Sequence, residues 1–512
     1  MRTSNNLKSH TRRRVGLMLT LLVLIAVAIV APARLVFTAI KPAVNVPPPV
    51  IWSAPVNLGP VINSTAADQQ PAISPDGLSL YFTSNRVAGS LGGFDMYVSQ
   101  RASILDSWGP PMNLGPAVNT TFDEGNAAFS RDGRLLFFQS KRLPSLGGID
   151  LFVAQRNNPH DDFEWQPAVN LGAAINSTTD DMGPYYFEDE VRGTRQLYFG
   201  SARLGGNDIY VSGQMADGSF AAATLVPELS SPSNESDPWI RHDGLEVFFQ
   251  SNRTGSIGMG DLWVATRGST ADAWSTPVNV GSPINTASAE QNAYFSSDGM
   301  TLFFASDRTG GSGGLDLYMS TRTLPIVRSK NITLAADESC SAIISPGDVD
   351  DGSFDSVDGG PLTLSLDPAG PFGLGEHTVR LIATDDRGLT NSAIAIVTVA
   401  DQTPPVISNA SVDKPTLWPP NHQMIEVTVN YTTTDNCGGP AASLDVSSNE
   451  AINGTGDGDT APDWEIVDAH HVRLRAERSG QGSGRIYTIT ITATDSHGNT
   501  SSQAVTEGVP HN

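Results

Sequence analysis

Five acidic residues recur at nearly even spacing and are the first candidates for chemistry in this chain. Each precedes an apolar stretch, and they are Asp68, Glu124, Asp181, Glu235 and Glu290. At equivalent positions of a closed repeat fold, their carboxylates would form a ring suited to a cation or to a basic or polyhydroxyl ligand. The competing interpretation is structural, with each carboxylate accepting backbone N–H groups or an arginine from the neighbouring repeat.

A second acidic group occupies the glycine-rich loop at residues 453–464. It contains Asp457, Asp459 and Asp463, whose oxygens are ligands that Ca²⁺ prefers. The loop lacks the glutamate that closes an EF-hand, so an acidic surface loop is the alternative. A weaker acidic cluster spans residues 348–358. The sequence thus predicts Ca²⁺ as a cofactor, held by those three aspartates.

Other catalytic patterns are missing from the sequence. Glycoside hydrolases need two carboxylates that flank the scissile bond, and such residues should be unique to their repeat. The acids here recur from repeat to repeat. The nine histidines are scattered, and no Gly-x-Ser-x-Gly motif or paired cysteine motif occurs. We therefore predict no catalytic residue and no enzyme.

These acids belong to a repeat that covers residues 51–323. Aromatic residues open the repeats every 54 to 57 residues, at Trp52, Trp108, Trp165, Phe220 and Trp274. Each repeat has room for four short strands, marked by segments such as Ser74-Pro75-Asp76-Gly77 and the following Leu80-Tyr81-Phe82. Four strands in such a period are typical of a β-propeller blade.

The motif Ser-Pro-Asp-Gly, Leu-Tyr-Phe, Ser-Asn-Arg and Asp-Met-Tyr-Val resembles the WD40-like repeat of TolB-type β-propellers. Five repeats predict five blades. Typical TolB-type propellers have six, which is the alternative. The last repeat lacks its outer strand, so residues 52–58 are expected to supply it and close the ring.

Two further positions recur in every repeat. An arginine ends the second strand (Arg86, Arg142, Arg203, Arg253 and Arg308), and an aspartate opens the third (Asp95, Asp150, Asp208, Asp261 and Asp316). Because a buried charge is retained when paired, we expect an Arg–Asp or Arg–backbone pair inside each blade. The third repeat departs most, since Glu188-Asp189-Glu190 and the following residues predict a lengthened hairpin.

Residues 324–402 and 403–512 follow a different pattern. Each has a run of Ala-Thr-Asp-x-x-Gly between alternating strands, as in the closing hairpin of an immunoglobulin-like sandwich. Both resemble bacterial hyalin-repeat and Ig-like modules, joined at Asp401-Gln402-Thr403-Pro404-Pro405. Cys340 and Cys437 lie in different modules, and we expect two free thiols, with one bridge between modules as the alternative. Trp418 is expected to pack its ring within its loop, with an exposed sugar-stacking ring as the alternative.

The N-terminal segment and the net charge of the chain limit where the protein can be located and what it can bind. Five basic residues precede an uncharged apolar run, Val15 to Val30, and Ala31-Pro32-Ala33. Residues 1–33 are therefore a signal peptide or a membrane anchor, followed by a linker at 34–50. Removing those five charges takes the net charge from −23 to −28. So acidic a chain excludes nucleic acid as a partner.

Together these patterns predict an all-β, exported bacterial protein with a five-bladed β-propeller followed by two Ig-like β-sandwich modules. We expect a monomer in the periplasm, at the cell surface or outside the cell, with the membrane involved only through a possible N-terminal anchor. The expected function is non-enzymatic binding of a cell-envelope protein or glycan by the propeller, with the Ig-like modules as a stalk. The alternative is a carbohydrate-active propeller enzyme, similar to a glycoside hydrolase, with accessory Ig-like domains.

Overall fold

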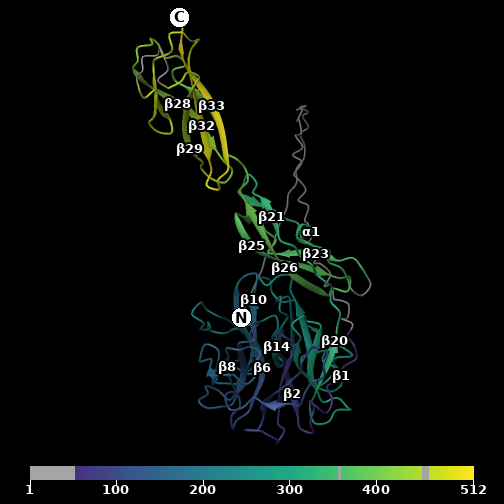
Figure 1. Cartoon of the computed structure of the whole chain (residues 1–512). Coiled ribbons are helices and arrows are strands. Elements are labelled where there is room, and N and C mark those ends of the chain that lie inside the picture. Colours follow the sequence, from purple (N-terminus) through teal and green to yellow (C-terminus); the bar gives the residue numbers. More distant parts are fainter. Residues whose placement is uncertain (1–51, 356–358, 453–460, 482, 512) are drawn as a thin grey trace, which may run out of the picture. The chain divides into compact units, whose positions relative to one another are not determined.

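The computed structural model describes residues 52–355, 359–452, 461–481 and 483–511. The predicted signal peptide or anchor (1–33) and the linker (34–50) lie outside these ranges. Among these described residues, the structure contains no helix that could span a membrane. The described chain is almost entirely β-structure, and its one helix, α1 (Pro346–Val349), has a single turn (Figure 1).

Residues 52–321 form a five-bladed β-propeller, as the sequence predicts. In chain order, the first four blades are β2 (Asp68–Ile73), β3 (Ser79–Ser84), β4 (Asp95–Gln100) and β5 (Met112–Asn113); β6 (Glu124–Phe129), β7 (Leu135–Ser140), β8 (Asp150–Gln155) and β9 (Val169–Asn170); β10 (Asp181–Asp189), β11 (Thr194–Ser201), β12 (Asp208–Gly213) and β13 (Thr224–Leu225); and β14 (Glu235–Ile240), β15 (Glu246–Ser251), β16 (Asp261–Thr266) and β17 (Val278–Asn279).

The fifth blade closes the ring with a strand from the start of the described chain. It contains β18 (Glu290–Phe295), β19 (Thr301–Ser306) and β20 (Asp316–Thr321), and its outer strand is β1 (Val56–Asn57). β1 runs antiparallel to β20, with Val56 opposite Met319. The prediction that residues 52–58 supply the missing outer strand is confirmed. Because the ring is closed, no blade leaves a long unpaired edge at this seam.

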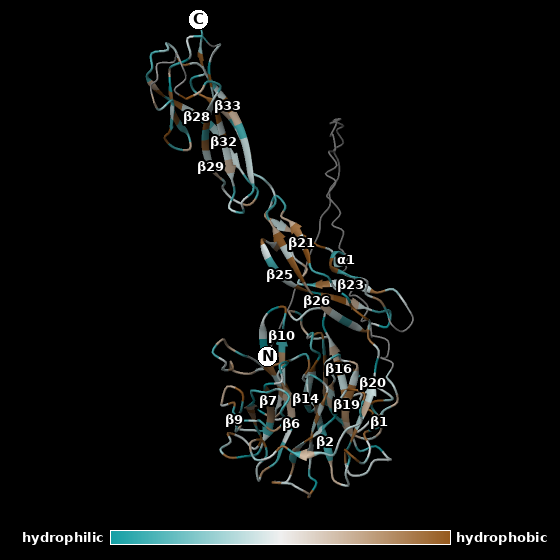
Figure 2. Cartoon of the chain, viewed as in Figure 1, coloured by the Kyte–Doolittle hydropathy of each residue, from teal (hydrophilic) through white to brown (hydrophobic). Residues whose placement is uncertain are grey.

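Each blade is held between its two neighbours, and this explains its sequence. The first strands of the blades contact one another in a ring, β2 to β6 to β10 to β14 to β18 and back to β2. The second strand of a blade is buried on both faces, as in β3, where all six residues are buried. Continuous apolar runs such as Leu80-Tyr81-Phe82 are what a strand covered on both sides requires. Figure 2 shows hydrophobic residues on the strands and mostly hydrophilic residues in the loops between them.

A tight turn connects the first two strands of each regular blade. In the first blade, the Ser74 hydroxyl donates to Asp76 Oδ1 at 2.6 Å, and the Leu78 amide donates to the same oxygen at 3.0 Å. Gly77 has a φ of 74°, a conformation that glycine adopts without strain. The recurring Asp-Gly pairs are therefore turn residues. The third blade has instead a longer hairpin, because β10 extends to Asp189, which pairs with Thr194.

Residues 324–402 form a small sandwich. One sheet has the order β21 (Ile332–Ala335), β26 (Thr390–Ala400), β25 (Gly375–Thr384) and β23 (Thr363–Asp367), and a second pairs β22 (Ser341–Ala342) with β24 (Phe372–Gly373). β21 is parallel to β26, while the other pairs are antiparallel. The core contains Val379, Leu381, Ala395 and Val397.

Residues 403–511 form two sheets around a second apolar core. Their orders are β27 (Val406–Val412), β28 (Met424–Thr434), β31 (His471–Arg475) and β30 (Trp464–Ile466), and β29 (Ala441–Ser448), β32 (Gly484–Thr494) and β33 (Thr500–Pro510). Counted from β27, these orders are 1-2-5-4 and 3-6-7, the arrangement found in constant-type immunoglobulin sandwiches. The Ig-like character of the two C-terminal modules stays a prediction.

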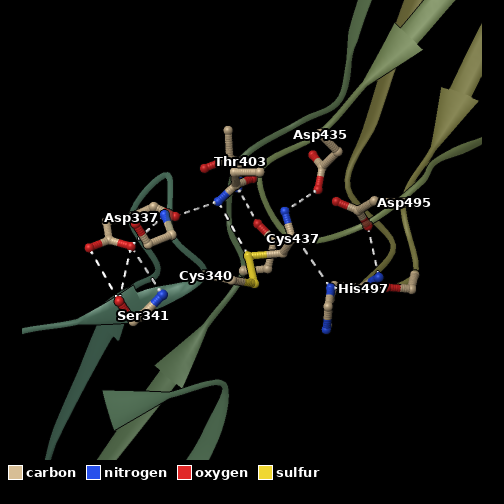
Figure 3. The surroundings of a disulfide bond; sticks show 12 residues. Asp337, Cys340, Ser341, Thr403, Asp435, Cys437, Asp495 and His497 are labelled. Carbon is tan, nitrogen blue, oxygen red and sulfur yellow. Dashed lines mark hydrogen bonds and ion pairs between the residues drawn. A yellow bond between two sulfur atoms is a disulfide. The ribbon is translucent and has the colours of Figure 1, made fainter. Parts of the chain in front are cut away.

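The prediction of two free thiols is wrong. Cys340 and Cys437 form a disulfide, with their Cα atoms 5.1 Å apart (Figure 3). The bond joins the two C-terminal modules, which was the alternative. Sequence reasoning paired each cysteine with strands of its own module, where neither finds a partner. It had no means of placing the loop after β28 beside the loop before β22.

Candidate functional site

The five recurring acids lie at the start of the innermost strand of each blade, where the alignment of repeats places them. These five residues are almost completely buried, with exposed fractions of 0% for four and 2% for Glu124. Each forms an ion pair with the arginine of its own blade: Asp68–Arg86 at 2.5 Å, Glu124–Arg142 at 3.4 Å, Asp181–Arg203 at 2.7 Å, Glu235–Arg253 at 3.1 Å and Glu290–Arg308 at 3.1 Å.

Further donors complete the surroundings of each carboxylate. Glu290 accepts the amide and the hydroxyl of Thr286 at 2.8 and 2.7 Å, and the hydroxyl of Ser306 at 3.0 Å. The other blades repeat this pattern with serine or threonine in the same place. Throughout the described propeller these five carboxylates are thus engaged inside their own blades. The geometry favours the structural interpretation of the acids over a ligand-binding ring, with the difference that the arginine comes from the same blade.

The predicted arginine pair has a different acid from the one that we expected. Four of the five expected acids instead accept backbone amides. Asp95, for example, accepts the amides of Leu91 at 2.5 Å and Gly92 at 3.1 Å, and the side-chain amide of Asn113 at 2.8 Å. The arginine does also bond to backbone, since Arg86 donates to the Ile62 carbonyl at 2.7 Å. The Arg–backbone alternative is therefore correct, and the Arg–Asp pair involves the inner strand.

The central channel is lined by a ring of residues that sequence reasoning missed. Two residues after each acid, the inner strand bulges, and the bulged residue has a left-handed φ of 54° to 58°: Gln70, Asn126, Gly183, Asp237 and Asn292. Asn126 donates its side-chain amide to Asp237 at 2.8 Å. Burial raises the pKa of Asp237, although bonds from Ser236, Asn126 and Asn292 act in the opposite direction. In four of the five blades the first three residues of the inner strand are all polar or glycine, so the bulged residue does not stand out in the sequence.

A cavity of about 370 Å³ opens where the inner strands end. Aromatic rings line it, and Tyr185, Trp239 and Tyr294 are shared with the narrow central channel. The ring centroids of Tyr185 and Trp239 are 5.8 Å apart, and those of Tyr185 and Tyr294 are 6.2 Å apart. Trp239 also packs on Phe295 at 4.3 Å. This apolar lining with a few polar groups has the composition of a small-molecule site. We call it the mouth pocket.

Two carboxylates line the mouth pocket, Glu188 and Glu190. Both come from the lengthened hairpin of the third blade, and the corresponding turns of the other blades have no glutamate there. The Arg131 amide donates to Glu188 at 2.7 Å, and the Arg131 guanidinium forms an ion pair with Glu190. The side chains are 23% and 46% exposed, so both are accessible from the pocket.

The residue between them, Asp189, has the opposite orientation, as alternation along a strand requires. It is buried, accepts the hydroxyl of Thr270, and forms an ion pair with Arg192 at 3.6 Å. Asp189 therefore fixes the hairpin, while its two neighbours face the cavity. This is the division of roles that sequence reasoning missed when it treated the segment as a lengthened turn alone.

His242 and two tyrosines add groups that stay neutral near pH 7. Desolvation lowers the pKa of His242 to about 4, with Arg131 and Arg241 acting in the same direction and Asp243 opposing them. Burial raises the pKa of Tyr185 and of Tyr294 well above the usual range. The other ionisable side chains that line the pocket are those of Glu188, Glu190 and Arg131.

The predicted calcium ligands are only partly within the described structure. Asp457 and Asp459 lie outside the described residues. Asp463 is 2% exposed and forms an ion pair with Arg485 at 2.6 Å. A cationic partner at this distance occupies one oxygen of Asp463, so this residue has a structural contact besides any role toward Ca²⁺. Trp418 does not pack as we expected, since it is 55% exposed.

Comparison with known proteins gives matches of fold alone. No family model and no curated protein matches the chain. Among solved structures, it aligns with an α-L-arabinofuranosidase from Lactobacillus brevis (14% identity, 52% of this chain and 92% of that one, TM-score 0.36) and with an endo-arabinase from Bacteroides thetaiotaomicron (15%, 51% and 95%, 0.36). The catalytic domain of a Coprinopsis cinerea GH62 α-L-arabinofuranosidase aligns at 13% identity, over 54% and 98%, with a TM-score of 0.36.

These matches correct two predictions made from the sequence. The structures that align are glycoside hydrolases and not TolB-type proteins, so the expected TolB-type resemblance is wrong. The expected non-enzymatic binding function and the prediction of no enzyme are contradicted in the same way, since the solved structures that align are glycoside hydrolases. Similarity at these identities and TM-scores assigns no activity, which has to be argued from the residues of the mouth pocket.

Proposed function

We propose that the propeller is a carbohydrate-active domain that hydrolyses a glycosidic bond in the mouth pocket. One observation carries this proposal: the pocket combines an aromatic lining with two carboxylates that occur in only one blade. Repeated acids serve the blade, whereas glycoside hydrolysis needs two carboxylates at one place. Glu188 and Glu190 meet this requirement, and the five repeated acids do not.

The lining suits a sugar ring as the ligand. Sugar rings present C–H groups on their faces and hydroxyls at their edges, so an apolar wall with polar groups at the rim matches them. Trp239 and Tyr294 form the wall, while Glu188, Glu190 and Arg131 supply acceptors and donors. A cavity of about 370 Å³ is within the usual range for small-molecule sites.

The two glutamates flank Asp189 in the third-blade hairpin. Glu188 belongs to β10, and Glu190 is the first residue of the turn that follows this strand. The ion pair with Arg131 suits Glu190 to the role of the ionised base. The acid role is then left to Glu188, which has to be protonated before it donates to the leaving oxygen. The Arg131 amide and Arg195, at 3.5 Å, are its polar neighbours in the absence of substrate.

The proposal keeps the prediction of an exported protein. It also keeps the two C-terminal modules as accessory units of the propeller. The exposed ring of Trp418 is available on the second of these modules for stacking on a glycan, the alternative that the sequence left open.

The test is hydrolysis of a panel of aryl furanosides and pyranosides together with plant and bacterial polysaccharides. The panel includes arabinan and arabinofuranosides, after which the aligned enzymes are named. We expect release of reducing sugar from at least one member. Glycans that bind on an array but give no product would contradict the enzymatic function.

A further inference from the structure

Three side chains that could hold a metal ion meet at the junction of the two C-terminal modules. Asp401 directly follows β26, at the start of the connection between the modules, while Asp495 and His497 belong to the turn between β32 and β33. One ligand atom from each of the three lies within 4.8 Å of the other two. Figure 3 shows Asp495 and His497 in the surroundings of the Cys340–Cys437 disulfide.

The burial of Asp401 is the second observation. This residue is 6% exposed, and its Oδ2 accepts no hydrogen bond among the described residues. Its polar neighbour is Nδ1 of His497, at 3.2 Å. Its other oxygen accepts the Thr403 amide at 3.1 Å. A buried carboxylate oxygen without a donor is costly, and proteins retain such an atom when a cation or a ligand satisfies it.

The first C-terminal module contains the same turn with a different neutralising residue. There, Asp385 accepts the amides of Arg387 and Leu389, as Asp495 accepts those of His497 and Asn499. The Arg387 guanidinium lies 2.9 Å from Asp385 and 3.3 Å from a second acid, Asp355.

In the second module, His497 occupies the position of Arg387. A guanidinium is a permanent cation that blocks metal binding. An imidazole is neutral near pH 7 and can bind a metal through a ring nitrogen. The two modules therefore contain the same acidic turn in two versions. In the first module an arginine occupies the place where a metal ion could bind, and in the second module a histidine leaves this place available.

We infer that Asp401, Asp495 and His497 form a binding site for a divalent transition metal of the zinc class. One imidazole nitrogen and two carboxylate oxygens are ligands that Zn²⁺ and Co²⁺ accept. Ca²⁺ prefers six to eight oxygens, which a site with three ligands, one of them an imidazole, does not supply. The fourth position of a tetrahedral ion would be left to water. This site is distinct from the predicted calcium loop and from the mouth pocket.

A metal at this place would fix the connection between the modules. Asp401 belongs to the connection, and Asn499 already donates its side-chain amide to the Asp401 carbonyl at 3.1 Å. Metal binding would add a second cross-link to the junction, beside the Cys340–Cys437 disulfide. The expected consequence is a more stable junction, by an amount set by metal concentration relative to Kd.

The experiment uses the untagged full chain, because a histidine tag would bind the same metals. Metal-free protein is titrated with Co²⁺, and absorption in the visible region reports a tetrahedral site. Zn²⁺ is then added as competitor, and the melting temperature is recorded with and without Zn²⁺. The matched variant is His497→Arg, which copies the arrangement of Arg387 and is expected to fold, since the first module tolerates it.

We expect one Co²⁺ per chain with tetrahedral bands, displaced by Zn²⁺, and a rise in melting temperature on adding Zn²⁺. In His497→Arg, both the bands and the Zn²⁺-dependent rise should be lost. Asp401→Asn gives the same readout if His497→Arg fails to fold, with affinity reduced at least about tenfold as one ligand's charge is removed. Equal Co²⁺ binding by wild type and the folded variant would overturn the inference, as would the absence of tetrahedral bands in the wild type.

Discussion

The five acids that recur in the blades, which we call the frame acids, are Asp68, Glu124, Asp181, Glu235 and Glu290. They differ from the carboxylates outside this frame in how many of their oxygens have a hydrogen-bond or ion-pair partner. In the frame, each buried acid has an arginine and hydroxyl or amide donors. Outside it, the described residues include buried carboxylate oxygens without a hydrogen-bond partner, and these belong to Asp401, Asp435, Glu450, Asp463, Glu477 and Glu507. All of them lie in the C-terminal modules. The accessible pair at the mouth pocket, Glu188 and Glu190, is likewise outside the frame.

The difference teaches that recurrence marks structural residues in this molecule. A buried charge that recurs in all five blades is retained only when the same blade also supplies an oppositely charged or hydrogen-bonding partner. A carboxylate that occurs once is free of this constraint, so it can bind a proton, a metal ion or a sugar. The acids with the most regular spacing were therefore the poorer functional candidates.

The largest expected change in stability comes from breaking one frame pair. In Glu235→Ala, Arg253 would stay largely buried without its carboxylate, along with the hydroxyls of Ser231 and Ser251. Removing one partner of such a buried pair costs about 3–5 kcal/mol. Chemical denaturation followed by tryptophan fluorescence should show the propeller transition shifted by this amount. A shift below about 1 kcal/mol would mean that the frame acids are not structural.

A smaller effect of opposite sign is expected outside the frame, at Glu507. Burial and the nearby Asp413 raise its pKa to about 7, with Lys414 opposing them. The raised pKa favours the protonated form in the fold, so this contribution is complete below pH 4.5 and is lost as the pH rises through 7. Glu507→Gln should therefore be more stable than wild type at pH 8, by up to about 3 kcal/mol.

The control for this prediction is a measurement at low pH. At pH 4 the wild-type side chain is protonated and resembles glutamine, so the two proteins should melt at the same temperature. Thermal melts at several pH values measure the difference. A variant that is less stable than wild type at pH 8 would show that Glu507 has a partner as effective as those in the blades.

The smallest effect is expected for an exposed pair beside the frame. Lys141 and Asp123 are 2.8 Å apart, but their side chains are 51% and 34% exposed. Solvent screens such pairs, so Lys141→Ala should cost less than about 1 kcal/mol. The same denaturation experiment checks it. If Lys141→Ala lost as much stability as Glu235→Ala, burial could not explain why the two ion pairs differ in their contribution to stability.

Much of the fold could be predicted from the sequence, because the same strand pattern occurs five times and each copy supports the assignment of strands and turns in the others. Five copies of one strand pattern fixed the blade count, the turns and the closure by residues 52–58. The site did not follow in the same way. Glu188 and Glu190 lie in the repeat that departs most from the others, and only the structure shows that alternation directs them into a pocket while Asp189 is directed away.

Two other features depended on contacts that no local pattern encodes. The Cys340–Cys437 bond joins two modules, so pattern matching within a module did not find it. The channel ring around Asp237 arises from bulges in strands that otherwise fit the repeat. In both cases the missing information was the position of one segment relative to another distant in sequence.

The most direct test of the central claim compares Glu190→Gln with Glu235→Ala in one hydrolysis assay. The first removes a single-copy carboxylate, and the second removes a frame carboxylate. We predict that Glu190→Gln lowers the hydrolysis rate about 100- to 10,000-fold without changing the melting temperature, as expected for loss of an acid–base group. Glu235→Ala should melt earlier yet hydrolyse at close to the wild-type rate below its transition. Undiminished hydrolysis by Glu190→Gln would contradict the account.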